Sequence, residues 1–111
     1  MTEIETFYAP EMGKPDADFC FIATGDSMKN AHINDGDIVF IHRQEHVNNG
    51  EIAAVMIDNA PVLKRFFYYE NLDMIVLKSE NTRYQDMIYT GEALNHVQVL
   101  GKAVAIQSRI V

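Results

Sequence analysis

The stretch that decides the fold is "FCFIATGDSMKNAHINDGDIVFI", residues 19–41. Its two ends, 19–23 and 38–42, are short apolar runs rich in aromatic and β-branched residues, and such runs predict strands. Between them, "SMKNAHI" predicts a turn or short helix, and Asp35-Gly36 supplies the residue tolerant of positive φ that a tight turn needs. The stretch therefore predicts two strands joined by a polar loop, with Ser27 placed directly after the end of the first strand.

The rest of the chain repeats this alternation of short apolar runs and turns. Further strands are predicted at 52–58, 62–70, 74–81 and 97–111, with turns at "NNGE" and "NAP", while 82–94 is left unassigned. No helical periodicity persists beyond about three turns. The 111 residues suffice for one core. The predicted fold class is all-β with short helical turns, arranged as a sandwich or a small curled, barrel-like sheet.

The domain organisation follows from the same pattern. Residues 1–15 include Pro10 and Pro15 and are expected to be an extended N-terminal arm or linker remnant, and 16–111 are expected to form the domain. The closing stretch is apolar and carries little charge. An exposed strand of that kind needs covering, so pairing with a second copy in a homodimer is expected.

Composition and charge limit the partners. Nine basic residues against sixteen acidic ones give a net charge of −7, which argues against direct binding of DNA, so any DNA contact is expected to belong to another domain. No apolar run reaches the roughly 18 residues of a membrane-spanning helix, and no signal peptide is recognisable. Cys20 is the single cysteine and is expected to be a buried thiol in a reducing cytoplasm.

The histidines do not predict a metal site or a cofactor. His42 and His46 are four residues apart, but that spacing suits a metal only on a helix, and this segment predicts a strand running into a turn. His32 and His96 stand in polar, turn-like contexts and are expected to be solvated. Neither an HExxH nor a CxxC motif is present.

Ser27 and Lys64 are the side chains that could carry chemistry. A serine is a weak nucleophile until a base takes its proton. Alternation along the predicted strand places Lys64 on one face with Val62 and Phe66, where desolvation would lower its pKa and let it act as that base. Each has an ordinary alternative: Ser27 as a helix cap, and Lys64 as a side chain whose ammonium reaches water. The residues alone leave both alternatives open.

Taken together, the motifs match a family. The order "GDSM", "DGD", "NGE" and "VLKR" resembles the C-terminal domain of LexA-type repressors, lambda-type phage repressors and UmuD polymerase accessory proteins, which are self-cleaving peptidases with a Ser-Lys dyad. Lys64 follows Ser27 by 37 residues, a spacing similar to the family's. "SEN" at 79–81 and "VLGKAVAIQSRI" also resemble a turn and the final strand of the family. The resemblance covers 16–110 and implies the curled β-sheet of the LexA C-terminal domain.

The resemblance implies roles for the residues. Ser27 would be the nucleophile and Lys64 the general base, the backbone N–H groups of Asp26 and Ser27 would form the oxyanion hole, and Gly25 and Met28 would support the loop. It further implies a cytoplasmic, homodimeric bacterial or phage repressor of the SOS-response type, which cleaves its own linker to relieve repression. A RecA-type filament activates many relatives, and DNA would be bound only by an N-terminal domain absent from this chain.

Two departures from the family pattern keep alternatives open. Relatives cut an Ala-Gly or Cys-Gly bond upstream of the serine, and this sequence contains neither dipeptide. We therefore expect the product left after cleavage, or a segment trimmed to the catalytic domain. Many relatives also carry Thr where this chain has Val62. The alternatives are a UmuD-type accessory subunit of an error-prone polymerase and a non-catalytic dimerisation module of the same fold.

Overall fold

The computed structural model describes residues 3–7 and 17–108, which form eight strands and three short 3-10 helices. The strands are β1 (Glu3–Phe7), β2 (Phe19–Thr24), β3 (Ile38–Arg43), β4 (Ile52–Ile57), β5 (Ala60–Tyr69), β6 (Met74–Lys78), β7 (Met87–Thr90) and β8 (Val97–Gln107). The helices are η1 (Lys29–Ala31), η2 (Glu70–Leu72) and η3 (Gly91–His96). All eight strands belong to one sheet, in the order β1-β2-β3-β8-β4-β5-β6-β7, and every neighbouring pair is antiparallel. The predicted all-β class is confirmed.

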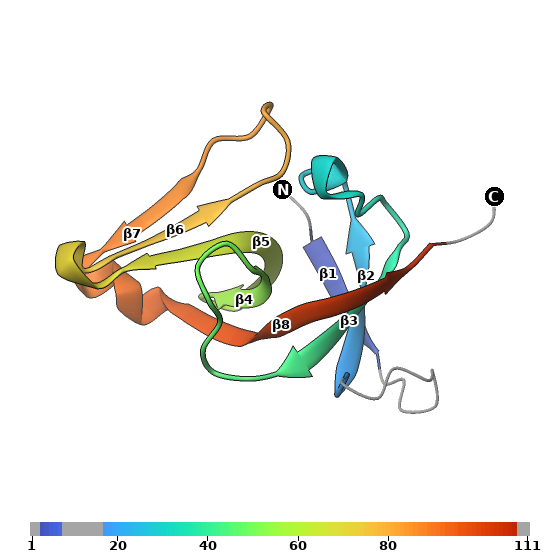
Figure 1. Cartoon of the computed structure of the whole chain (residues 1–111), viewed down its shortest axis with the longest axis horizontal. Coiled ribbons are helices and arrows are strands. Elements are labelled where there is room, and N and C mark those ends of the chain that lie inside the picture. Colours follow the sequence, from blue (N-terminus) through green and yellow to red (C-terminus); the bar gives the residue numbers. More distant parts are fainter. Residues whose placement is uncertain (1–2, 8–16, 109–111) are drawn as a thin grey trace.

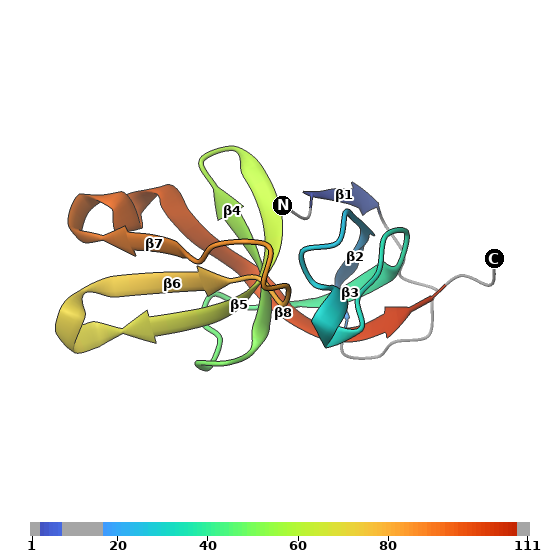
Figure 2. The same ribbon diagram turned by 90° about the horizontal axis from the view of Figure 1, so that it is seen from above.

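The sheet is curled around its longest strand. β8 runs the length of the molecule, with β1, β2 and β3 at one end and β5, β6 and β7 at the other (Figures 1 and 2). The register of β8 shifts opposite Phe40 and Ile41 on β3 and again opposite Ala54 and Val55 on β4. Irregularities of this kind bend a strand and increase its twist. The curl is sufficient for β1 to pair with β5 as well, where Glu3 lies opposite Val62.

Strands β4 and β5 separate two hydrophobic cores, because successive side chains of a strand point to opposite faces. One core contains Phe21, Ala23, Met28, Ile33, Val39, Ile41, Ala54 and Leu63. The other contains Ala53, Val55, Val62, Phe66 and Leu77. The two strands are therefore buried on both faces in their middle, and a polar side chain placed there is withdrawn from water whichever way it points.

Most predicted strands lie within a few residues of the observed ones, and the differences are local. The turn predicted at "NAP" is wrong in position, because β5 already begins at Ala60 and the chain reverses at Asp58, where φ is 53°. The unassigned stretch 82–94 contains β7 and the start of η3. Of the expected arm, residues 3–7 form β1, and the remainder lies outside the described residues.

Candidate active site

The loop after β2 turns Ser27 into the protein. Gly25 has a φ of 86°, which glycine adopts without a steric penalty, and its N–H donates to the Asp35 carboxylate at 2.8 Å. Ser27 and Met28 follow at 0% and 1% exposure, and Met28 packs in the core with Phe21. Met28 therefore fixes the loop from beneath. The N-cap residue of η1 is Met28, which makes no side-chain hydrogen bond to the helix.

Lys64 is buried at the centre of β5. It lies on the strand face shared with Val62 and Phe66, as alternation predicts, and its exposure is 1%. This rules out the alternative in which the ammonium reaches water. Within residues 17–108 no carboxylate forms an ion pair with it. Burial lowers the pKa of Lys64 from 10.5 to about 8, because desolvation disfavours the ammonium form.

The structure brings Ser27 and Lys64 together. Lys64 Nζ donates to Ser27 Oγ at 3.2 Å and to Ser79 Oγ at 2.8 Å, and all three side chains are buried. When the lysine is neutral, its nitrogen carries a lone pair that can accept the Ser27 hydroxyl proton over the same contact. A hydroxyl within hydrogen-bond reach of a neutral amine is the arrangement that an activated serine nucleophile requires.

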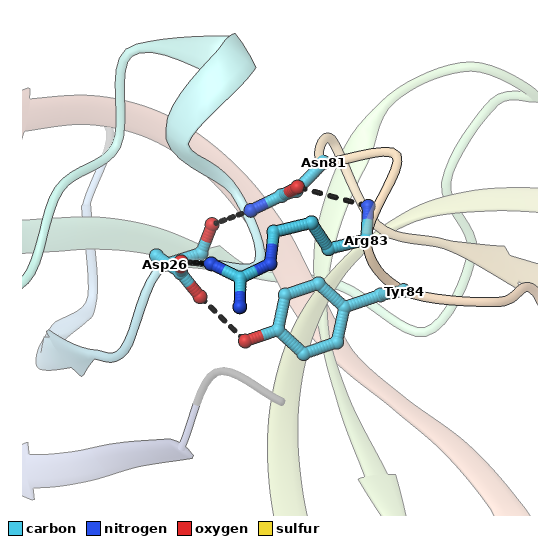
Figure 3. A network of polar contacts seen from close by, with 4 residues as sticks. All are labelled: Asp26, Asn81, Arg83 and Tyr84. Carbon is cyan, nitrogen blue, oxygen red and sulfur yellow. Dashed lines mark hydrogen bonds and ion pairs between the residues drawn. The ribbon is translucent and has the colours of Figure 1, made fainter.

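The loop between β6 and β7 is fastened to Asp26, the residue before Ser27. Asn81 Nδ2 donates to the Asp26 carbonyl at 2.9 Å, the Tyr84 hydroxyl donates to the Asp26 carboxylate at 2.5 Å, and Arg83 forms an ion pair with the same carboxylate at 3.8 Å (Figure 3). The hydrogen bond from Tyr84 lowers the pKa of Asp26. The Tyr84 ring also lies 5.9 Å from Lys64 Nζ. This loop therefore covers the Ser27–Lys64 contact.

Sequence reasoning identified Ser27 and Lys64 but missed the residues of the covering loop. "SEN" was interpreted only as a turn, yet Ser79 contacts the lysine and Asn81 contacts the Asp26 backbone. The signal that could have found them is polar composition directly after a buried strand, since a loop at such a point faces the neighbouring strand ends. The predicted oxyanion donors, the N–H groups of Asp26 and Ser27, remain a prediction.

The other candidate side chains lie outside this site. His32, His42, His46 and His96 are all exposed, and His42 and His96 form pairs with Asp18 and Asp58. Cys20 is buried, as predicted, and burial raises the pKa of its thiol. Across residues 17–108 no group of His, Cys, Asp or Glu is arranged to hold a metal ion. None of the helices described here is long and apolar enough to span a bilayer.

Comparison with known proteins shows the family to which the chain belongs. Residues 2–104 match the family described as Peptidase S24-like. The LexA repressor of Thermotoga maritima is 36% identical over 88 residues, which cover 79% of this chain and 42% of that protein. The LexA repressor of Citrifermentans bemidjiense is 41% identical over 83 residues, covering 74% of this chain and 39% of that protein. The chain thus spans about two fifths of the length of these curated relatives. It belongs to the Peptidase S24-like family, as a domain of the LexA C-terminal type.

Proposed function

We propose that this domain cleaves its own polypeptide, with Ser27 as the nucleophile and Lys64 as the general base. One observation carries the proposal: a fully buried lysine amine lies 3.2 Å from a fully buried serine hydroxyl. Burying a lysine that has no carboxylate partner within residues 17–108 is costly, so stability alone does not account for it. With a pKa of about 8, the Lys64 amine is about half neutral at pH 8, and a base for serine must be neutral to accept the proton.

The proposed reaction is an acyl transfer. The neutral Lys64 amine takes the Ser27 hydroxyl proton as Oγ attacks the scissile carbonyl carbon. The resulting oxyanion would be held by the backbone N–H groups of Asp26 and Ser27, a contribution of about 3 kcal/mol for a well-placed donor. The Lys64 ammonium then protonates the leaving amine, which breaks the peptide bond and leaves an acyl-serine. Water, deprotonated by the same amine, hydrolyses that ester and regenerates the dyad.

The direction of β1 favours a substrate from the chain's own N-terminal side. Glu3, the first residue of β1, lies opposite Thr24 on β2 and Val62 on β5. These positions are close in sequence to Ser27 and Lys64, and from there β1 runs away from the dyad towards Phe7, opposite Cys20. A linker upstream of β1 therefore approaches the protein at the end of the sheet where the dyad lies. Such a linker is the substrate we propose, and within the proposed arm, residues 1–15, β1 is the part that pairs with the proposed domain, residues 16–111.

We further propose that the protein containing this domain is a homodimeric repressor in the cytoplasm. Beyond Lys102, β8 pairs with β3 only among the described strands, and Val104 and Ile106 on that segment are 38% and 37% exposed. An unpaired edge with apolar side chains favours pairing with a second copy. A dimer would hold two N-terminal DNA-binding domains at a palindromic operator, and cutting the linker would separate them from the dimer.

Intact mass spectrometry of the full-length protein tests this proposal. We expect the wild type to split at pH 7 to 10, and Ser27→Ala and Lys64→Ala to stay whole. Lys78→Ala is the matched control, because it removes an exposed lysine from the strand beside β5 and should cleave like the wild type. The mass of the released fragment distinguishes a repressor, which loses a DNA-binding domain, from a polymerase accessory subunit, which loses a short tail. If the wild type stays whole with a RecA-type filament present, the domain is a non-catalytic module.

A further inference from the structure

We propose that Ser79 is a positioning residue that orients the Lys64 amine so that its lone pair faces Ser27. This inference deepens the proposed function and rests on it. A neutral primary amine has two N–H bonds and one lone pair, and it rotates freely about the Cε–Nζ bond. A lone pair that points away from Ser27 cannot accept its proton. The base therefore needs a second contact that fixes this rotation.

Ser79 supplies that contact. Its Oγ accepts from Lys64 Nζ at 2.8 Å, which is shorter than the 3.2 Å between Nζ and Ser27 Oγ. When one N–H donates to Ser79, rotation about the Cε–Nζ bond is restricted, and the lone pair can then face Ser27. Val62, two residues before Lys64 on the same strand face, is buried and offers no hydrogen-bonding group in its side chain. Ser79, directly after the end of β6, is thus the residue that brings a hydroxyl to the amine from the neighbouring segment.

The position of Ser79 is fixed by contacts that do not involve the lysine. Before it, Leu77 is fully buried in the second core. After it, Asn81 and Tyr84 bind Asp26, the residue next to the nucleophile (Figure 3). Ser79 itself is 7% exposed. The loop therefore ties the orienting hydroxyl to the loop that carries the nucleophile, so that the three polar groups keep one mutual geometry.

Ser79 would also act after the first proton transfer. The ammonium that forms has three N–H bonds and needs acceptors in a site withdrawn from water. The Ser79 hydroxyl accepts one of them and favours the charged form, so its removal should lower the pKa of Lys64 further. A residue with only a structural role would not change this pKa, and the difference separates the two roles by experiment.

Rates of self-cleavage in the full-length protein across pH 6 to 10 test the inference. In Ser79→Ala, we expect the plateau rate at high pH to fall about tenfold, equivalent to about 1.4 kcal/mol, and the midpoint to move to lower pH. Ser79→Thr keeps a hydroxyl and should restore most of the rate. Thr82→Ala is the matched control, since it removes an exposed hydroxyl from the same loop and should leave rate and midpoint unchanged.

A direct titration keeps this test separate from that of the proposed function. In full-length protein carrying Ser27→Ala, which stops cleavage, NMR of the labelled lysine side chain gives the pKa of Lys64 with and without Ser79→Ala. We expect Ser79→Ala to lower this pKa by about half a unit. Should the wild type fail to cleave, the proposed function is wrong, and the titration still decides whether Ser79 holds the amine. In the titration, an unchanged pKa of Lys64 would overturn the inference. In the rate measurements, it would be overturned if Ser79→Ala and Ser79→Thr lost the same cleavage rate and the midpoint of the pH profile stayed the same.

Discussion

Replacing Lys64 with methionine should change the free energy of unfolding more favourably at pH 7 than at pH 10, when each value is compared with that of the wild type at the same pH. The pKa of Lys64 is 10.5 in an unfolded chain and about 8 in the fold. At pH 7 both states carry the proton, and the folded state bears a desolvation cost of about 3 kcal/mol. Between pH 8 and 10.5 the unfolded state binds more protons than the folded state, so the free energy of unfolding rises with pH until the cost disappears. Methionine has a similar length and never bears this cost.

The replacement also has a constant cost. Ser27 and Ser79 lose their contact with the amine, and each lost hydrogen bond removes about 1 kcal/mol at any pH. The informative quantity is therefore the difference in unfolding free energy between Lys64→Met and the wild type, followed across pH. We expect it to fall by about 2.5 kcal/mol from pH 7 to pH 10.

Urea denaturation of the 111-residue chain at fixed protein concentration measures this difference, and groups common to both proteins cancel in it. Lys78→Met serves as the control, because Lys78 is exposed and its replacement should change stability by less than about 0.5 kcal/mol at every pH. A Lys64→Met difference that stays constant between pH 7 and pH 10 would refute the reasoning, since it would mean that the buried amine titrates like an ordinary lysine.

Three further predictions concern the strands and loops around Ser27 and Lys64. A Cβ at position 101 would lie 2.3 Å from the backbone oxygen of His42, so Gly101→Ala should cost more than about 3 kcal/mol, and an unchanged melting temperature would contradict the β3–β8 register. Tyr84→Phe removes the donor that lowers the pKa of Asp26, so NMR should show that pKa rising towards its usual range; no rise would exclude the hydrogen bond. Ile106→Asp places a charge on the exposed part of β8 and should shift the proposed dimer towards monomer in sedimentation, whereas a dimer that is unchanged by the substitution would exclude β8 from the interface.

The sequence predicted the strands well because their signal is local. Alternating apolar residues and Gly or Asn turns mark each strand without reference to the rest of the chain. The sheet order could not be predicted in this way. β8 lies between β3 and β4, which come many residues earlier, and neither its two changes of register nor the β1–β5 pairing leaves a mark in the local pattern.

The candidate site shows the same division. Alternation placed Lys64 on the face of Val62 and Phe66. It could not show that this face is buried, because both faces of β5 are covered, as the full burial of Leu63 on the opposite face shows. Ser79 was not predicted, because its partner Lys64 belongs to another strand and a serine in a turn has many ordinary uses. Residues that act through contacts between distant segments can be identified only from a structure, whereas residues in a spaced motif can be identified from the sequence.

The most direct test of the central claim is the pH dependence of self-cleavage in the full-length protein. We expect a first-order rate that rises about tenfold per pH unit at low pH and levels off with a midpoint near the pKa of Lys64, about 8. Lys64→Ala should show no cleavage at any pH in this range. A rate that does not depend on pH, a midpoint close to 10.5, or cleavage by Lys64→Ala at the wild-type rate would contradict the assignment of Lys64 as the base for Ser27.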